Sequence, residues 1–168
     1  MTESQLLTAI KAELVAQTWT GGAGVVFPTG CVAITADVDL AMESALQTMR
    51  TPFGLLQPLG TTSDPEFDED PNFVALNLKL RLIVMVPGDA VGENALMGAN
   101  KTGGALVSQG RGVFEVEQEV FNAMGRLNGL EGVILQCRQK GGISAAIVGN
   151  NIYVAYRDLQ YEALGTLV

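Results

Sequence analysis

The segment at residues 76–86 constrains the fold more than any other part of the sequence. Its even positions are all leucine or valine, whereas its odd positions begin polar at Asn77 and end apolar at Met85. Successive side chains of a strand point to opposite faces of a sheet, so this alternation predicts one long strand with one face buried along its whole length. The other face would pass from an exposed region into a covered one.

Three segments have the apolar periodicity of helices that face a core, at residues 2–17, 37–50 and 112–127. The first begins with a capping-box pattern at Thr2 and Gln5, and the second begins at Asp37 as N-cap. The stripe of the first helix could instead pack on a partner subunit. In the third helix, Glu115, Glu119, Asn122 and Arg126 are expected to face away from the core. The expected buried residues are Leu6, Leu7, Ile10, Leu14 and Val15 in the first helix, Leu40, Ala41, Ala45, Leu46 and Met49 in the second, and Val113, Val116, Val120, Met124 and Leu127 in the third.

Short apolar runs predict further strands, separated by two long connections. The strands are expected at 25–27, 31–34, 53–56, 132–138, 143–148 and 152–163, with hairpin turns at 140–142 and 149–151, where Gly and Asn tolerate positive φ. An acidic loop at 60–71 and a Gly-rich loop at 88–111 flank the long strand. We therefore expect a single α+β domain over residues 1–168, with a central mixed or antiparallel sheet covered by about three helices.

Composition excludes several classes of function. The chain has 168 residues, 10 basic against 18 acidic, for a net charge of −8, so it lacks the basic surface that generic nucleic-acid binding needs. Histidine is absent, which removes the Ser-His-Asp triad, the Cys-His dyad and the HExxH zinc site. We expect no enzyme activity, no cofactor and no metal, although paired carboxylates for glycoside hydrolysis depend on tertiary distances that a sequence does not give.

Two segments resemble ligand-binding loops, but each lacks a residue that the motif requires. Lys101 lacks the preceding Gly of a phosphate-binding loop, and the acidic loop has Glu69 where a calcium loop needs Gly. Cys31 and Cys137 could form a disulfide, but two unpaired buried thiols are the favoured interpretation. The N-terminal residues do not have the layout of a signal peptide, and no apolar run is as long as a membrane span, so we expect a soluble protein made inside the cell.

The order of these elements resembles the tail terminator (tail completion) proteins of long-tailed bacteriophages. The segments that carry the resemblance are TESQLLTAIKAELV, FVALNLKLRLIVMVPG, GVFEVEQEVFNAMG and IYVAYRDLQYEAL. It spans nearly the whole chain as architecture, and the helix at 37–50 and the long Gly-rich loop depart from the smaller members of the family. The resemblance implies a six-membered ring at the head-proximal end of the tail tube.

Such a ring would end tube polymerisation and join the tail to the head. The implied partners are further copies of the chain, the tail tube protein and the head-closure or connector protein. DNA would pass through without specific binding, and no membrane would be involved. The implied location is the virion tail or neck, after synthesis in the host cytoplasm. A head-closure or neck adaptor protein, and a small α+β hydrolase or ligand-binding domain, remain as alternatives.

The two long loops are the expected contact regions. They flank a strand of at least eleven residues, which at about 3.3 Å per residue places them roughly 36 Å apart, at opposite rims of a ring. The acidic loop would repel DNA in the lumen, pair with basic groups of a docking protein, or be solvated surface only. The expected partner or lumen contacts are Asp64, Glu66, Asp68, Glu69, Asp70, Lys101 and Arg111.

Overall fold

The computed structural model describes residues 1–22, 24–48, 50–63, 73–87, 93–98, 111–148 and 152–167. It contains one five-stranded sheet of order β1-β2-β3-β5-β4, in which only β1 is parallel to its neighbour. The strands are β1 (Val32–Ile34), β2 (Phe53–Ser63), β3 (Phe73–Pro87), β4 (Ile134–Val148) and β5 (Ile152–Thr166), and the helices are α1 (Glu3–Ala16), α2 (Val38–Gln47), α3 (Glu93–Met97) and α4 (Val113–Leu127). The predicted α+β class with a single mixed sheet is confirmed.

The long strand predicted at 76–86 is β3, which lies in the middle of the sheet between β2 and β5. Its even-numbered side chains from Leu76 to Val86 are between 0% and 3% exposed. On the opposite face, Ile83 and Met85 are buried as well, whereas Asn77 lies toward the exposed end. Both predictions from the alternation, one buried face and a second face that becomes covered, are therefore confirmed.

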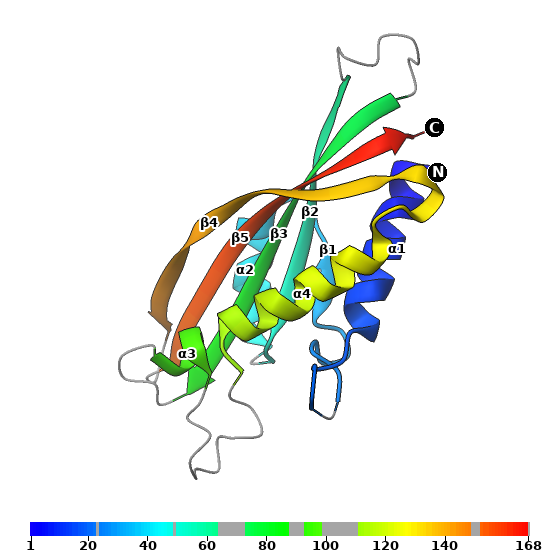
Figure 1. The fold of residues 1–168 in the computed structure, drawn as a ribbon. Helices are drawn as coiled ribbons and strands as arrows, with labels where there is room; N and C mark the ends of the chain where they lie inside the picture. The colour runs from blue at the N-terminus through cyan, green and yellow to red at the C-terminus, as the bar shows by residue number, and fades with distance from the viewer. Residues whose placement is uncertain are drawn as a thin grey trace.

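Helices cover both faces of the sheet. In Figure 1, α1 and α4 lie in front of the sheet and α2 lies behind it. The capping box of α1 forms as predicted, with Thr2 accepting a hydrogen bond from the Gln5 backbone N–H. The predicted apolar stripe of α4 is buried throughout, from Val113 to Leu127.

Two residues expected in the core are instead exposed. Val15 is 43% exposed because it lies one residue, about 100° of helix rotation, beyond the buried stripe that ends at Leu14. Leu40 is 73% exposed because the buried side of α2 is set by Val38 and Ala45, and Leu40 lies on the opposite side of the helix. Met49 lies outside the described residues.

The strand predictions need more correction. Residues 25–27 are not a strand, because Val25 makes only an isolated bridge to Thr18. β2 continues to Ser63, so residues 60–63 of the expected acidic loop pair with β3 instead. The predicted hairpin at 140–142 is wrong: β4 is continuous along β5, and the glycines there lie in a register shift, where a bulge absorbs extra residues.

The Gly-rich connection contains a short helix that the sequence did not predict, α3, which packs against α4, β3 and β5. The remainder of that connection lies outside the described residues. So does the predicted turn at 149–151, although Val148 pairs with Ile152 on either side of it. Cys31 and Cys137 are free thiols, the first buried and the second partly buried, and burial raises the pKa of both. Among the described residues, no helix combines the length and the apolar character that crossing a membrane requires.

Candidate functional site

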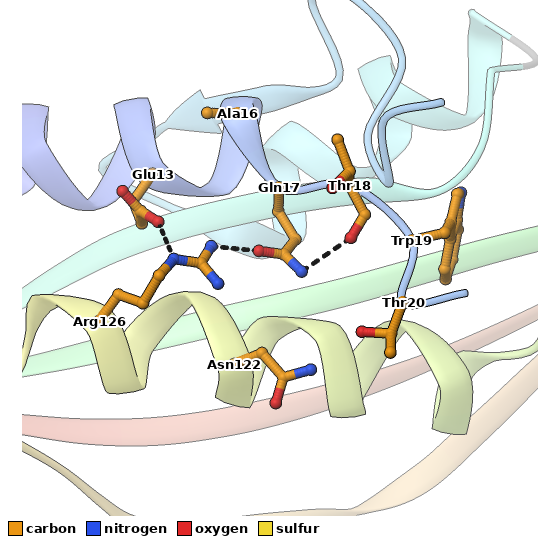
Figure 2. Close-up of a pocket in the computed structure, with 8 residues that line it drawn as sticks. All are labelled: Glu13, Ala16, Gln17, Thr18, Trp19, Thr20, Asn122 and Arg126. Atoms are coloured by element: carbon orange, nitrogen blue, oxygen red, sulfur yellow. Dashed lines mark hydrogen bonds and ion pairs between the residues drawn. The ribbon is translucent and has the colours of Figure 1, made fainter. Parts of the chain in front are cut away.

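A polar cleft of about 490 Å³ opens between the C-terminal end of α1 and the outward side of α4. It exists because α1 ends at Ala16 and the chain turns sharply at Gln17, whose backbone is extended, to cross α4 (Figure 2). Its volume is in the range of small-ligand sites. The lining, however, is mostly polar, and its side chains contact one another and the neighbouring Glu119.

Glu119 is 6% exposed and is hydrogen-bonded to three of the residues that line the cleft. Its carboxylate accepts hydrogen bonds from Gln17 Nε2 at 2.7 Å, the Thr20 N–H at 2.8 Å, Thr20 Oγ1 at 3.0 Å and Asn122 Nδ2 at 3.2 Å. Burial by itself raises the pKa of Glu119, but these donors outweigh it and hold the pKa below its ordinary value. The side chain is therefore ionised at neutral pH. Its hydrogen bonds to Gln17 and Thr20 hold the turn after α1 against α4.

The expectation that Glu119 faces away from the core is wrong. Glu119 lies three residues after Val116 and so shares the inward face of α4. A carboxylate can be buried there only because Gln17 and Thr20, about a hundred positions earlier in the chain, supply its donors. No local pattern in the sequence could have shown this.

Arg126 closes the outer end of the cleft. Figure 2 shows it between Glu13 and Gln17: its Nε donates to Glu13 Oε1 at 2.5 Å and its Nη2 donates to Gln17 Oε1. The last turn of α1 has no basic residue of its own. Arg126 therefore supplies, from α4, the cation that the negative end of the α1 dipole favours.

Arg111, one of the expected contact residues, is held within its own chain. Its guanidinium lies 4.8 Å from the centroid of the Trp19 ring, and Nη1 ion-pairs with Glu115 at 3.0 Å. Gly22 lies close to this pair, and a Cβ there would lie 3.1 Å from both Arg111 Nη2 and Trp19 Cβ, so a larger residue would displace them slightly. Arg111 thus anchors the point where the Gly-rich connection rejoins the described chain.

The remaining expected contact residues are not placed. Asp64, Glu66, Asp68, Glu69, Asp70 and Lys101 all lie outside the described residues. The structure does describe the residues on either side of these segments. The acidic segment follows β2 at Ser63 and leads into β3 at Phe73, while the Gly-rich segment follows β3 at Pro87. The two segments therefore begin at opposite ends of β3, as predicted.

A second charged cluster, which no sequence pattern predicts, lies under α2. Arg81 is 5% exposed and binds both carboxylate oxygens of Asp158, with Nε to Oδ1 at 2.7 Å and Nη2 to Oδ2 at 2.8 Å. It also reaches Asp39 on α2 at 2.5 Å, and its guanidinium lies 4.7 Å from the centroid of the Tyr156 ring. Lys79 adds a second cation 3.0 Å from Asp158.

These contacts change the pKa of Asp158. Burial raises it, but hydrogen bonds and charge attraction from Arg81 and Lys79 outweigh burial, so the pKa lies below its ordinary value. The buried carboxylate of Glu117 is paired with Arg157 at 2.6 Å and Lys140 at 3.0 Å. Most cations of the described chain are thus engaged with its own carboxylates: Lys79, Arg81, Arg111, Arg126, Arg138, Lys140 and Arg157.

Most polar side chains of the cleft are already engaged: Arg126 binds Glu13 and Gln17, and Thr20 and Asn122 donate to Glu119. Within the ranges that the structure describes, no group of three or more His, Cys, Asp or Glu side chains could hold a metal ion. No protein-family model and no curated protein matches the chain. The fold is thus an α+β domain in which most cations of the described residues are ion-paired with carboxylates of the same chain.

Proposed function

We propose that the chain is a structural virion protein, a phage tail terminator. In this proposal it forms a six-membered ring at the head-proximal end of the tail tube, ends tube polymerisation and joins the tail to the head connector. DNA passes through the centre, and no catalytic step is involved. Its partners are further copies of itself, the tail tube protein and the head-closure or connector protein.

The observation that carries the proposal is the internal pairing of the cations. A ring through which DNA slides must not hold phosphates, and phosphate binding depends on Lys and Arg that can displace counterions. The chain has a net charge of −8, and its buried or half-buried cations, such as Arg81 and Arg157, are bound to its own carboxylates. A channel lined by such a protein is neutral or repulsive toward DNA.

The placement of the two long connections supports the same function. β3 spans fifteen residues, which is roughly 50 Å at about 3.3 Å per residue. A terminator needs one surface for the tube and a different surface for the head. Connections that begin at opposite ends of such a long strand suit contacts with two different partners.

Electron microscopy of the negatively stained, purified protein tests the proposal. The expected image is a ring with sixfold symmetry and a central hole. Uniform particles of the size of a single 17.7 kDa chain at all concentrations would contradict it. They would favour the ligand-binding alternative instead, for which the cleft between α1 and α4 is the site to examine.

Neutralising the acidic segment separates its two possible roles in the ring. The variant carries Asp64→Asn, Glu66→Gln, Asp68→Asn, Glu69→Gln and Asp70→Asn together. Folding should remain intact, because charges on a polar connection contribute only about 0–1 kcal/mol each. If the segment docks, heads should fail to join tails. If it lines the lumen, joining should persist while DNA passage slows. Normal joining and normal infectivity would show that it has neither role.

A further inference from the structure

Helix α2 is attached to the sheet by few buried side chains. Of its ten residues only Val38 and Ala45 are buried, whereas eight of the fifteen residues of α4 are. Leu40 is 73% exposed, and the other apolar side chains of α2 are only half-buried: Ala41, Met42 and Leu46. A helix of this length is marginal in water without packing. α2 therefore depends on contacts that remove little apolar surface from water.

The polar link between α2 and the sheet is made by Arg81. Its Nη1 donates to Asp39 Oδ1 at 2.5 Å and lies 3.6 Å from Met42 Sδ. Asp39 and Met42 are three positions apart and so lie on one side of the helix. Among the described residues, no other hydrogen bond or ion pair joins α2 to a strand. One guanidinium nitrogen thus carries this polar attachment.

Arg81 does not need α2 to hold its position. Its other two nitrogens bind the carboxylate of Asp158 at 2.7 and 2.8 Å, and its guanidinium lies 4.7 Å from the centroid of the Tyr156 ring. Both partners belong to β5, the neighbour of β3. Asp39, by contrast, is 76% exposed, so it is hydrated whether or not it contacts Arg81. Because Asp158 still compensates Arg81 after separation, opening leaves no buried charge unpaired.

The chain is held to the sheet on both sides of α2. Before the helix, Ala36 O accepts a hydrogen bond from Gln57 Nε2 at 2.7 Å. After the helix, Thr51 Oγ1 accepts one from the Met85 N–H at 3.0 Å. Both bonds lie outside Val38–Gln47. α2 can therefore leave the sheet while the chain on either side of it stays attached.

We propose that α2 is a lid over Arg81, latched by Asp39, which opens while the sheet and the other helices stay folded. In the closed form Arg81 is 5% exposed. Opening uncovers the guanidinium nitrogen that Asp158 does not hold, so the open form presents a cation that the closed form hides. The inference concerns a single chain and does not depend on the proposed function.

Hydrogen–deuterium exchange in low concentrations of denaturant tests the opening, on protein diluted until native mass spectrometry shows single chains. The amides of α2 should exchange at least roughly 100-fold faster than the slowest amides of β3 and α4, because a local opening needs less free energy than unfolding. Their exchange should depend little on denaturant, because the release of one helix exposes little surface. The slowest amides of β3 and α4 should show the steep dependence of global unfolding.

Two variants of α2 test the latch. Asp39→Asn removes the ion pair and should speed the exchange of α2 by roughly threefold to fivefold, as expected for a pair with one exposed partner. Glu43→Gln is the matched control, since Glu43 is also an exposed carboxylate of α2 and has no ion-pair partner among the described residues. It should change the exchange of α2 by less than roughly twofold. Both variants should leave β3 and α4 unchanged.

Two results would overturn the inference. One is exchange of the wild-type α2 at the rate and with the denaturant dependence of β3, which would mean that α2 opens only when the domain unfolds and requires no variant to fold. The other is equal acceleration by Asp39→Asn and Glu43→Gln, which would show that Asp39 is not the latch. Rings whose α2 exchanges like β3 would refute the lid and leave the proposed function standing. Single chains at all concentrations with a fast α2 would do the opposite.

Discussion

The two faces of the central sheet are covered in different ways. On one face, the leucines of β3 are buried, α4 packs against β3, and α1 packs against α4 and β1. The apolar stripes of both helices are almost fully buried. On the other face, α2 buries only Val38 and Ala45 and is joined to the sheet through the Arg81 cluster. The first face has its buried carboxylates on α4, at Glu119 and at Glu117, which pairs with Arg157 of β5, whereas the second face places Arg81 on the central strand of the sheet.

This difference has energetic consequences. Apolar packing stabilises in proportion to the area removed from water and does not demand one geometry. A buried ion pair has a desolvation cost that can cancel its attraction, but removing one partner leaves a charge without compensation. We therefore expect substitutions on the apolar face to be tolerated if they are small and apolar, and to unfold the protein if they introduce a charge. On the α2 face, loss of Arg81 should strongly lower the stability.

The largest expected effect is on the apolar face. Leu80→Asp should unfold the protein, because Leu80 is fully buried and an unpaired buried carboxylate costs several kcal/mol against a total stability of about 5–15 kcal/mol. Circular dichroism and thermal denaturation would measure this. A cooperatively folded Leu80→Asp protein would refute the orientation of β3 described above.

On the α2 face, Arg81→Ala should destabilise by about 3–5 kcal/mol, because it removes the buried partner of Asp158. Asp39→Ala is the matched control: it breaks the other ion pair of Arg81, but the Asp39 side chain is 76% exposed, so the loss should stay within about 1 kcal/mol. Denaturant titration gives both values. Equal losses from the two variants would contradict the account, because α2 would then depend on Asp39 as much as the sheet depends on Arg81.

A smaller effect is expected where α1 meets α4. Glu119→Gln replaces one acceptor oxygen by a donor that faces Gln17 and Asn122, and should cost about 1–3 kcal/mol at neutral pH. Because the pKa of Glu119 is lowered in the folded state, its contribution is present above the ordinary glutamate pKa of about 4.3 and is lost as the pH falls through the folded value. The stability difference between wild type and Glu119→Gln should therefore shrink below about pH 4. A difference that stays constant from pH 7 to pH 3 would rule out this role.

The smallest effect is expected at Tyr161, in the apolar layer under α4. Its hydroxyl is buried and has no hydrogen-bond partner, and burial raises the pKa of the side chain. Removing an unsatisfied polar group gives back its desolvation cost, so Tyr161→Phe should be neutral or stabilising by up to about 1 kcal/mol. Destabilisation beyond about 1 kcal/mol would mean that the hydroxyl has a partner, such as a bound water.

How far the sequence predicted this structure depends on where each element finds its partners. β3, α1 and α4 were predictable because their periodicity is local and one face of each is buried along its length. The extension of β2 through Gly60 to Ser63 was missed because its residues are typical of a loop, and they form a strand only by pairing with the exposed start of β3. The continuity of β4 through Gly141 depends in the same way on β5.

The charged sites were the least predictable. Arg81 and Asp158 are 77 positions apart, and Gln17 and Glu119 are 102 apart. The residue type and the local sequence of each of these side chains are typical of the protein surface. Only the tertiary fold brings each one to its partner. Of the expected contact residues, Arg111 alone is described, and its contacts with Trp19 and Glu115 could not be inferred from its neighbours in the chain.

A polymerisation assay tests most directly our proposal that the protein ends a growing tube. A phage tail tube protein would be polymerised in the presence and absence of the purified chain, and tube lengths would be measured by electron microscopy. The account predicts that the chain binds one end of each tube and stops its growth, so that tubes become shorter as more is added. Tubes that bind no chain and grow to the same lengths in its presence would contradict it.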